Sequence, residues 1–347
     1  MKTSDFYFDL PQQLIAQKPS VIRGADRLML LEKQTGSVSH FVMSDLPRLV
    51  ERGTLMVFND SRVRKSRCFA QRVGGKRRQE FLFIDKVDTQ GRIWKCVSKG
   101  ARKAKTGSVW HFEDGNEAEV VSPDTGVDEG GVRYLRFSSP LGESWFETNG
   151  HVPLPPYIKR QDSAQDSDRY QTVYAKDVGS AACPTAGLHF TEGLLRQLRE
   201  CGVEFAWITL HVGLGTFLPV RAENVEDHTM HKEIYTITTQ AAQLVNDAKR
   251  QGRAVLAVGT TSVRALESSC GKDGLVEAGT RSTCIFIYPG YEFKVVDELL
   301  TNFHTPESTL LMLVSAFTGR DNILSAYKTA VAQKYRFFSY GDAMLIK

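Results

Sequence analysis

The stretch AVLAVGTTSVRALESSC, residues 254–270, decides the fold class of this chain. Its first five residues are apolar and match a buried strand, and Gly259 then turns the chain into a helix that runs to about Cys270. A buried strand that leads directly into a helix is the repeating unit of α/β folds. This stretch therefore predicts an α/β layer with a largely parallel sheet.

The segments on both sides of this stretch continue the alternation of helix and strand. Thr191 is placed to cap a helix that Gly202 ends, and Pro306 fits the first turn of a later helix. Residues 161–169 form a polar loop without a regular pattern. The remaining predicted helices lie at 10–17, 240–250 and 321–333, and the predicted strands at 28–31, 55–58, 203–210 and 284–288.

Residues 62–150 have a different pattern. Short β-prone runs alternate with Gly, Pro and Asp turn residues and no helical period interrupts them, as in a small all-β barrel or sandwich. The simplest topology inserts this unit into a domain built from both ends of the chain. We therefore predict an α/β main domain, residues 1–61 and 151–347, with a mixed, largely parallel sheet, and an inserted small all-β barrel domain at 62–150.

The positive charge of the chain is concentrated in the predicted barrel. The formal net charge is only +4, but residues 62–105 hold 15 lysines and arginines against three acids, a net +12, which leaves −8 elsewhere. Such a block is typical of proteins that bind a phosphate backbone, although a solvated cationic face without a partner has the same composition. The candidates for contacts with such a backbone are Arg62, Arg64, Lys65, Arg67, Lys76, Arg77, Arg78, Arg102 and Lys103.

Composition excludes several classes of protein. The 347 residues, 41% apolar and 24% charged, match folded soluble chains, and the longest apolar stretch, 310–314, is far shorter than the ~20 residues of a membrane span. Asp5 and Asp9 interrupt the apolar core that a secretory signal needs, so we expect a cytoplasmic protein. The six cysteines are too widely spaced for a zinc ribbon or a redox pair, and we expect reduced thiols.

The segment VGTTSVR, residues 258–264, lies where α/β sheets bind ligands, between the end of a strand and the start of a helix. Free backbone N–H groups and the hydroxyls of Thr260 and Thr261 can hold an anionic or ribosyl group there. The motif is neither a Walker loop nor GxGxxG, because the lysine and the spaced glycines are missing. An ordinary helix cap explains the same residues.

Two further stretches carry titratable side chains. His211 directly follows a predicted strand in LHVGLGTF and fits either a catalytic residue or a buried, hydrogen-bonded histidine. In DHTMHKE, residues 227–233, the histidines His228 and His231 and the carboxylate of Glu233 fit a metal site, an acid–base pair or a polar surface turn. No cysteine or third spaced histidine nearby completes a metal ligand set, and we predict none.

Two polar clusters lie at predicted element ends. Asn59 and Asp60 follow an apolar run, and Asn302 and His304 precede the helix opened by Pro306. Asn and Asp after a strand are usually turn formers, so neither cluster alone predicts a binding site.

Together these stretches resemble one family, the S-adenosylmethionine:tRNA ribosyltransferase-isomerases of queuosine biosynthesis, the QueA family. The resemblance covers nearly the whole chain in order. The matching segments include FDLPQQLIAQKP (8–19), NDSRV (59–63), GHVPLPPYI (150–158), RYQTVYA (169–175), PTAGLHFT (184–191), TLHVGLGTF (209–217), DHTMHKE (227–233), AVGTTSVRALES (257–268), TNFH (301–304) and YRFFSYGDAMLI (335–346).

The resemblance implies an enzyme that transfers the ribosyl part of S-adenosylmethionine, rearranged, to 7-aminomethyl-7-deazaguanine at the tRNA wobble position. The implied product is epoxyqueuosine, with release of adenine and methionine. S-adenosylmethionine is then a substrate, and no cofactor is expected. The implied partner is a tRNA that carries this base, the enzyme is expected to be a monomer, and no membrane is involved.

For this reaction we take as candidate catalytic residues His211, His228, His231 and Glu233, with His189 and His304 in reserve. The candidate substrate-binding residues are Thr260, Thr261, Arg264, Asn302, His304, Asn59 and Asp60. A non-catalytic RNA-binding module remains the alternative, and it would not consume S-adenosylmethionine. An ordinary methyltransferase is a third interpretation, which the missing glycine-rich loop after the first strand disfavours.

Overall fold

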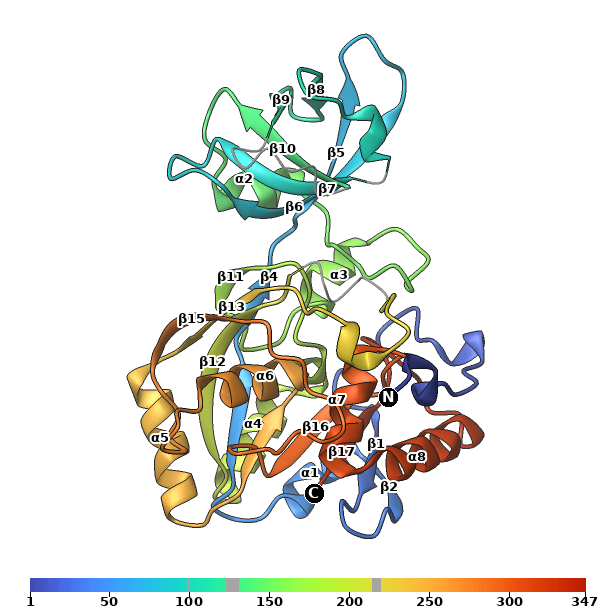
Figure 1. Cartoon of the computed structure of the whole chain (residues 1–347), viewed down its shortest axis with the longest axis vertical. Coiled ribbons are helices and arrows are strands. Elements are labelled where there is room, and N and C mark those ends of the chain that lie inside the picture. The colour runs from blue at the N-terminus through green and yellow to red at the C-terminus, as the bar shows by residue number, and fades with distance from the viewer. Residues whose placement is uncertain (99, 123–130, 214–219) are drawn as a thin grey trace.

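In this computed structural model, a nine-stranded sheet and a closed six-stranded barrel form two separate parts of the molecule (Figure 1). The structure describes residues 1–98, 100–122, 131–213 and 220–347, without the side chain of Arg102. The strand order of the sheet is β15-β13-β12-β3-β14-β16-β17-β1-β2. Its strands are β1 (Arg27–Leu31), β2 (Val38–Val42), β3 (Leu55–Asn59), β12 (Glu204–His211), β13 (Glu233–Ile237), β14 (Val255–Val258), β15 (Gly279–Thr283), β16 (Glu298–Asn302) and β17 (Ala343–Ile346).

The sheet is mixed. Four neighbouring pairs run parallel, among them the three successive pairs β12–β3, β3–β14 and β14–β16, and four run antiparallel. The predicted fold class, an α/β domain with a mixed sheet and an inserted all-β barrel, is confirmed. The central strands β3 and β14 are buried along their whole length, as apolar strands covered on both faces must be.

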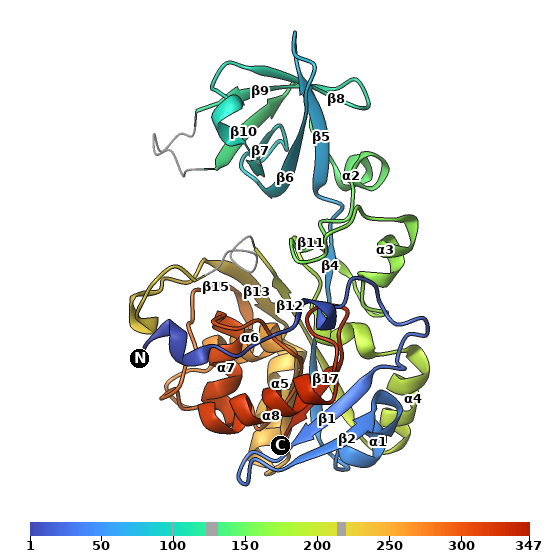
Figure 2. The same ribbon diagram turned by 90° about the vertical axis from the view of Figure 1, so that its right-hand side faces the viewer.

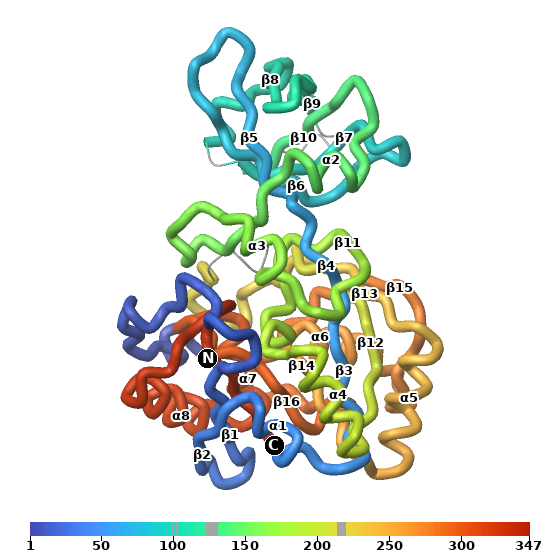
Figure 3. Tube along the Cα trace, turned by 180° about the vertical axis from the view of Figure 1, so that it is seen from behind, coloured from blue at the N-terminus to red at the C-terminus, as the bar shows by residue number. Residues whose placement is uncertain are grey.

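Helices cover both faces of the sheet. The larger core packs α5 (Thr239–Arg250), α6 (Thr260–Ser269), α7 (Thr309–Thr318) and α8 (Arg320–Ala332) against one face. The smaller core packs α1 (Leu46–Leu49), α4 (Glu192–Glu200) and the 3₁₀ turn η5 (Thr185–His189) against the other face. Figure 3 shows the molecule from this side. No helix in the described part of the chain is both long and apolar enough to cross a bilayer.

Local signals explain where several helices begin. Thr191 accepts a hydrogen bond from the N–H of Leu194 and caps α4, and Gly202 follows the helix with φ +84°, as the sequence predicted. The helix predicted from Pro306 begins later, at Thr309, because the Ser308 hydroxyl supplies the cap.

The inserted unit is a closed barrel in the order β10-β7-β6-β5-β8-β9. Its interior is filled mainly by aromatic side chains, and Trp145 and Phe146 of the helix α2 close it at one end. The predicted β-prone runs at 80–87, 92–97, 108–112, 118–121 and 132–137 correspond to five of the six strands. The first strand, β5, and the helix α2 were not predicted. The elements are β5 (Arg67–Arg72), β6 (Arg78–Lys86), β7 (Ile93–Ser98), η4 (Ala101–Lys103), β8 (Val109–Phe112), β9 (Glu117–Val121), β10 (Val132–Phe137) and α2 (Glu143–Asn149).

Two chain crossings join the barrel to the sheet. β3 continues through β4 (Ser61–Val63), which pairs with β11 (Asp177–Ser180), into the barrel strand β5, and the chain returns where His151 bridges Arg67. The carboxyl end of β3 therefore faces the barrel, as do the ends of its parallel neighbours (Figures 1 and 2). The domain limits at 62 and 150 stay predictions.

Three other expectations were wrong. The strand predicted at 284–288 is irregular chain whose apolar side chains pack on the larger core, whereas the true edge strand β15 precedes it. The helix predicted at 10–17 is only the 3₁₀ turn η2 (Gln12–Leu14). The loop 161–169 contains the helix α3 (Ala164–Arg169), opened by a capping box at Ser163. Among the residues that the structure describes, the other 3₁₀ turns are η1 (Thr3–Phe6), η3 (Met43–Asp45) and η7 (Val225–Asp227).

Candidate active site

The carboxyl ends of four neighbouring strands bring the sequence motifs together. β3 ends at Asn59, β12 at His211, β14 just before Gly259, and β16 at Asn302. In α/β sheets this edge is the usual place for ligands, because loops and helix starts surround it. We call it the sheet edge, and it faces the barrel (Figure 2).

His211 is the last residue of β12, and its ring lies against Gly179 of β11. A Cβ atom added at Gly179 would lie 3.2 Å from Nδ1 and from Cε1 of that ring. Nδ1 of His211 is buried and has no hydrogen-bond partner in the described structure. Burial lowers the pKa of His211, and the positive charge of Arg64 lowers it further. His211 is therefore neutral at physiological pH and able to accept a proton.

Glu233 and Arg264 form a buried ion pair at the same edge. Nη1 of Arg264 donates to Oε2 of Glu233, and the N–H of Gly213 donates to Oε1 over 3.2 Å. The two side chains are only 7% and 4% exposed. Nε and Nη2 of Arg264, which form one edge of the guanidinium group, are buried without a partner among the described residues. Two parallel N–H groups of this kind fit a carboxylate or phosphate.

The register of β12 and β13 places the side chains of His211 and Glu233 on opposite faces of the sheet. His211 is paired with Ile234, so the side chain of Glu233 points to the other face, where α6 supplies Arg264. Residues 214–219, which follow the Gly213 that binds Glu233, lie outside the described part. The structure thus brings His211 and Glu233 to one end of the sheet without a direct contact between them.

The start of α6 also lies at the sheet edge, directly after β14. Gly259 has φ +89° and would place a Cβ atom 3.5 Å from that of Ala186 in η5. No side chain caps α6, and Oγ1 of Thr261 is buried and unpaired. The alternative of an ordinary cap made by these hydroxyls therefore does not apply. Thr260, also buried, opens the helix beside it.

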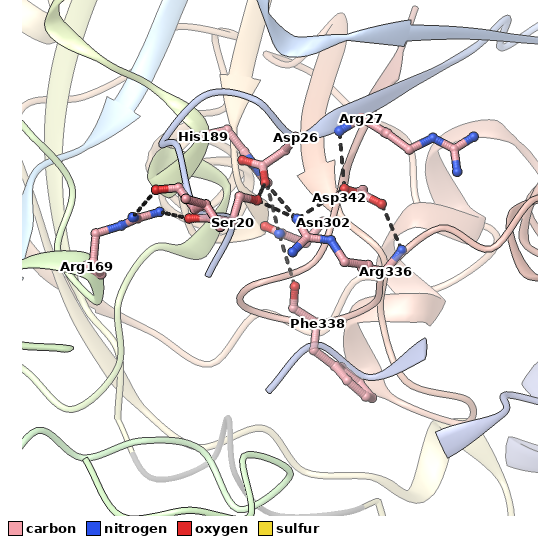
Figure 4. A network of polar contacts seen from close by, with 10 residues as sticks. Ser20, Asp26, Arg27, Arg169, His189, Asn302, Arg336, Phe338 and Asp342 are labelled. Carbon is pink, nitrogen blue, oxygen red and sulfur yellow. Dashed lines mark hydrogen bonds and ion pairs between the residues drawn. The ribbon is translucent and has the colours of Figure 1, made fainter. Parts of the chain in front are cut away.

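His189 belongs to a buried network on the smaller-core face (Figure 4). Its Nδ1 donates to Asp26 over 2.8 Å, and its Nε2 accepts from Nδ2 of Asn302 over 3.0 Å. Arg336 holds the other carboxylate oxygen of Asp26 at 2.8 Å. Both ring nitrogens of His189 are thus occupied, which suits a positioning role better than proton transfer. The same amide nitrogen of Asn302 also donates to the Phe338 carbonyl, and its Oδ1 is left buried and unpaired.

The remaining polar candidates have mainly structural contacts. Asn59 bridges β3 and β12, because its Oδ1 accepts from the N–H of Leu210 and its Nδ2 donates to the Leu210 carbonyl. Asp60 accepts from the Thr209 hydroxyl at 2.7 Å, and burial raises its pKa. Nε2 of His304 lies 3.1 Å from the Thr301 hydroxyl, and burial lowers the pKa of His304 to about 3, which keeps it neutral.

His228 and His231 lie in irregular chain just before β13. The ring of His228 packs edge-on against Phe286, with 5.2 Å between the ring centres. Burial lowers the pKa of His228, and the neighbouring His231 lowers it further. His231 is exposed. Within the described residues, no three His, Cys, Asp or Glu side chains gather as a metal would require.

Seven of the nine basic candidates fall into two groups. Arg64, Lys65 and Arg67 bind acids of the barrel at the domain junction: Glu143 at 2.8 Å from Nε of Arg64, Glu147 at 3.1 Å from Lys65 and Glu80 at 3.8 Å from Arg67. Lys76, Arg77, Arg78 and Lys103 instead line a pocket on the barrel, and Arg62 is exposed on β4. The side chain of Arg102 lies outside the described part.

Sequence reasoning missed Asp26 and Gly179. Asp26 is 163 positions from His189 and follows no predicted strand, and Gly179 contributes only the space that its missing side chain leaves. Arg336 lies in YRFFSYGDAMLI, a segment that carried the family resemblance, but no role was assigned to it.

Three comparisons with known proteins agree. The profile of the family described as "Queuosine biosynthesis protein" matches residues 3–346. An S-adenosylmethionine:tRNA ribosyltransferase-isomerase of Treponema denticola is 50% identical over 350 residues, and one of Acetivibrio thermocellus is 48% identical over 349, each match spanning all of both chains. The crystal structure of an S-adenosylmethionine tRNA ribosyltransferase from Thermotoga maritima is similar, with a TM-score of 0.55 and 35% identity, covering 99% of this chain and 100% of that one.

Proposed function

Because this chain belongs to the queuosine biosynthesis protein family, we propose that it is an S-adenosylmethionine:tRNA ribosyltransferase-isomerase. Its substrates are S-adenosylmethionine, for which no separate cofactor is needed, and a tRNA with 7-aminomethyl-7-deazaguanine at the wobble position. Its products are epoxyqueuosine in the tRNA, adenine and methionine. We expect the enzyme to act as a monomer.

The observation that carries the proposal is the group of buried, unpaired polar atoms at the sheet edge. Nδ1 of His211, Oγ1 of Thr261 and Nε and Nη2 of Arg264 all lack partners in the described structure. Native proteins leave few buried polar atoms unpaired, because each costs about 1–3 kcal/mol. Other buried unpaired atoms occur elsewhere in the described chain, but these four lie at the ligand-binding edge of an α/β sheet, which supports a polar substrate that completes their bonds.

The chemistry needs a base close to the sulfonium group. Positive sulfur acidifies the 5′ C–H of the ribosyl group, so a base can remove this proton and leave a carbanion stabilised by sulfur. Adenine then departs with a proton from a general acid, and the amine of the tRNA base bonds to a ribosyl carbon and gives up one proton. The carbanion carbon bonds to another ribosyl carbon and closes the five-membered carbon ring of the product. Closure of the epoxide breaks the carbon–sulfur bond, and methionine leaves as a neutral thioether.

We assign His211 as the base, because its lowered pKa keeps it neutral and Nδ1 has no competing partner. The free guanidinium edge of Arg264 suits the methionine carboxylate, and Glu233 holds that side chain in place. Of the two histidines before β13, we assign the exposed His231 as the acid that protonates adenine, because burial lowers the pKa of His228 and favours its neutral form. The hydroxyls of Thr260 and Thr261 suit the ribosyl group.

The decisive experiment is incubation with S-adenosylmethionine and a tRNA that carries the aminomethyl base, followed by mass analysis. The proposal expects epoxyqueuosine in the digested tRNA and free adenine and methionine in equal amounts. S-adenosylhomocysteine would instead indicate a methyltransferase. Tight tRNA binding without consumption of S-adenosylmethionine would indicate the non-catalytic RNA-binding module.

A further inference from the structure

A pocket of about 800 Å³ opens on one side of the barrel, and none of its lining residues belongs to the sheet edge. It extends from the β5–β6 hairpin to Gln161, in the loop before α3 that lies between the barrel and the sheet (Figure 1). We call it the basic pocket. Its lining residues are Phe69, Arg72, Gly75, Lys76, Arg77, Arg78, Gln79, Glu80, Gly100, Lys103, Lys105, Trp110 and Gln161.

Five cations of the basic pocket have no acidic partner in the described part of the chain: Arg72, Lys76, Arg77, Lys103 and Lys105. All five are exposed. The only acid in the lining is Glu80, and it faces Arg67 at 3.8 Å. Like charges gathered around one concave surface repel each other and concentrate anions from solution. The pocket is therefore built to hold an anion with several charges.

The lining of the pocket includes a guanidinium stacked on a ring. Arg78, which also pairs with Glu113, lies 4.0 Å above the ring centre of Phe69, whereas Trp110 is buried in the barrel core against Phe81. Exposed guanidinium planes provide stacking surfaces for nucleic-acid bases, in addition to phosphate contacts. An anionic peptide would use the cations but would gain little from this stacked pair.

We infer that the basic pocket binds phosphate groups of the RNA substrate, and that Arg72, Lys76, Arg77, Lys103 and Lys105 make these contacts. This inference rests on the proposed function and narrows it. Arg64, Lys65 and Arg67 are instead occupied by Glu143, Glu147 and Glu80 of the barrel. Two residues outside the sequence-based candidates, Arg72 and Lys105, thus belong to the RNA-contacting set.

The position of the pocket also fits a substrate that must reach the sheet edge. Gln161 lines its lower end, and the same loop continues into α3, which stands between the barrel and the strand ends (Figure 2). An RNA stem held in the basic pocket can extend along α3 towards His211. The cations then hold the substrate, and the sheet edge acts on one nucleotide.

The test reverses two charges in the pocket and two elsewhere on the same barrel. The double variant Lys76→Glu/Arg77→Glu is compared with Lys86→Glu/Arg92→Glu, whose side chains are exposed and outside the pocket. Binding of the aminomethyl tRNA is measured by filter retention between ~50 and 200 mM salt, where each lost phosphate contact flattens the log–log slope by roughly 0.7–0.9. Thermal melting shows whether both variants fold.

We expect the pocket variant to bind tRNA at least tenfold more weakly and with a slope shallower by about 2, and the control to stay within about threefold of the unmodified protein. Equal losses in both variants, or wild-type binding by a folded pocket variant, would overturn the inference. Failure of the proposed function looks different, because the unmodified protein would then bind tRNA and release no adenine from S-adenosylmethionine.

Discussion

The sheet edge and the basic pocket both carry polar groups without partners, but in opposite environments. At the sheet edge these groups are buried: Arg264 is 6% exposed, and Nδ1 of His211 is covered. In the basic pocket the cations are exposed to solvent. Buried groups act over hydrogen-bond distances and are screened little by salt, whereas exposed charges act over a Debye length of about 10 Å and are screened strongly. The first environment suits chemistry, and the second suits capture of a large anion.

The sharpest test of the sheet edge is removal of its base. We expect His211→Ala to lower kcat by roughly 10²–10⁴-fold, the usual contribution of a general base. Because the pocket is untouched, tRNA affinity should stay the same. Adenine release under single-turnover conditions measures the rate. A variant that keeps more than half of the rate would show that another group removes the proton.

Arg264→Lys should have the next largest effect. Lysine keeps a positive charge beside Glu233 but lacks the paired N–H edge that Nε and Nη2 provide. We expect the Kd for S-adenosylmethionine to rise roughly 10–100-fold, since a hydrogen bond to a charged group contributes about 1.5–3 kcal/mol. Equilibrium dialysis gives this value, and Arg281→Lys, at an exposed pair with Glu277, is the matched control. Unchanged affinity would exclude Arg264 as the carboxylate anchor.

Salt separates the two regions without any substitution. From ~50 to 200 mM salt the KM for tRNA should rise at least tenfold, as expected for several phosphate contacts, while the KM for S-adenosylmethionine changes less than about twofold. Steady-state kinetics with each substrate in turn provides both values. Equal salt dependence for the two substrates would contradict the contrast between a buried and an exposed site.

The same contrast explains what the sequence could predict. The barrel strands alternate buried and exposed positions, as in β7, so their period was visible. The sequence did not predict β15, because four of its five residues, 279–282, are exposed and show no alternation of apolar and polar side chains. The apolar run at 284–288 packs on the core without pairing, which period alone does not distinguish from a strand.

At the site, the motifs at strand ends were predictable because parallel strands end at one edge. Their hydrogen-bond partners were not. His189 fits a catalytic histidine until Asp26 and Asn302 are seen to occupy both of its nitrogens. Likewise the opposite faces of His211 and Glu233 depend on the pairing of β12 with β13, which one sequence does not specify.

The pH dependence tests the electrostatics at His211. Burial lowers its pKa below the ordinary value of 6.5, so the ring stays neutral, and able to accept a proton, below that pH. The acidic limb of kcat/KM should therefore lie below pH 6.5, and activity should be lost only when the ring is protonated. A limb at or above 6.5 would show that His211 is not the base or is not desolvated in the working enzyme.

The smallest expected effect comes from Gly179, because the three atoms nearest to a Cβ added there all belong to the ring of His211. In Gly179→Ala the new methyl group would lie 3.2 Å from Nδ1, so the ring must shift by a few tenths of an ångström. Gly279→Ala is the control, because Gly279 has a similar φ, +136° against +149°, but its nearest neighbour is the flexible Arg281 side chain at 3.9 Å.

Both variants should lose similar stability from backbone strain, about 1 kcal/mol, in thermal melts. Only Gly179→Ala should also lower kcat, by roughly 3–10-fold, because displacement of a positioned base weakens proton transfer. Equal kcat in the two variants would mean that the position of the His211 ring does not limit the reaction.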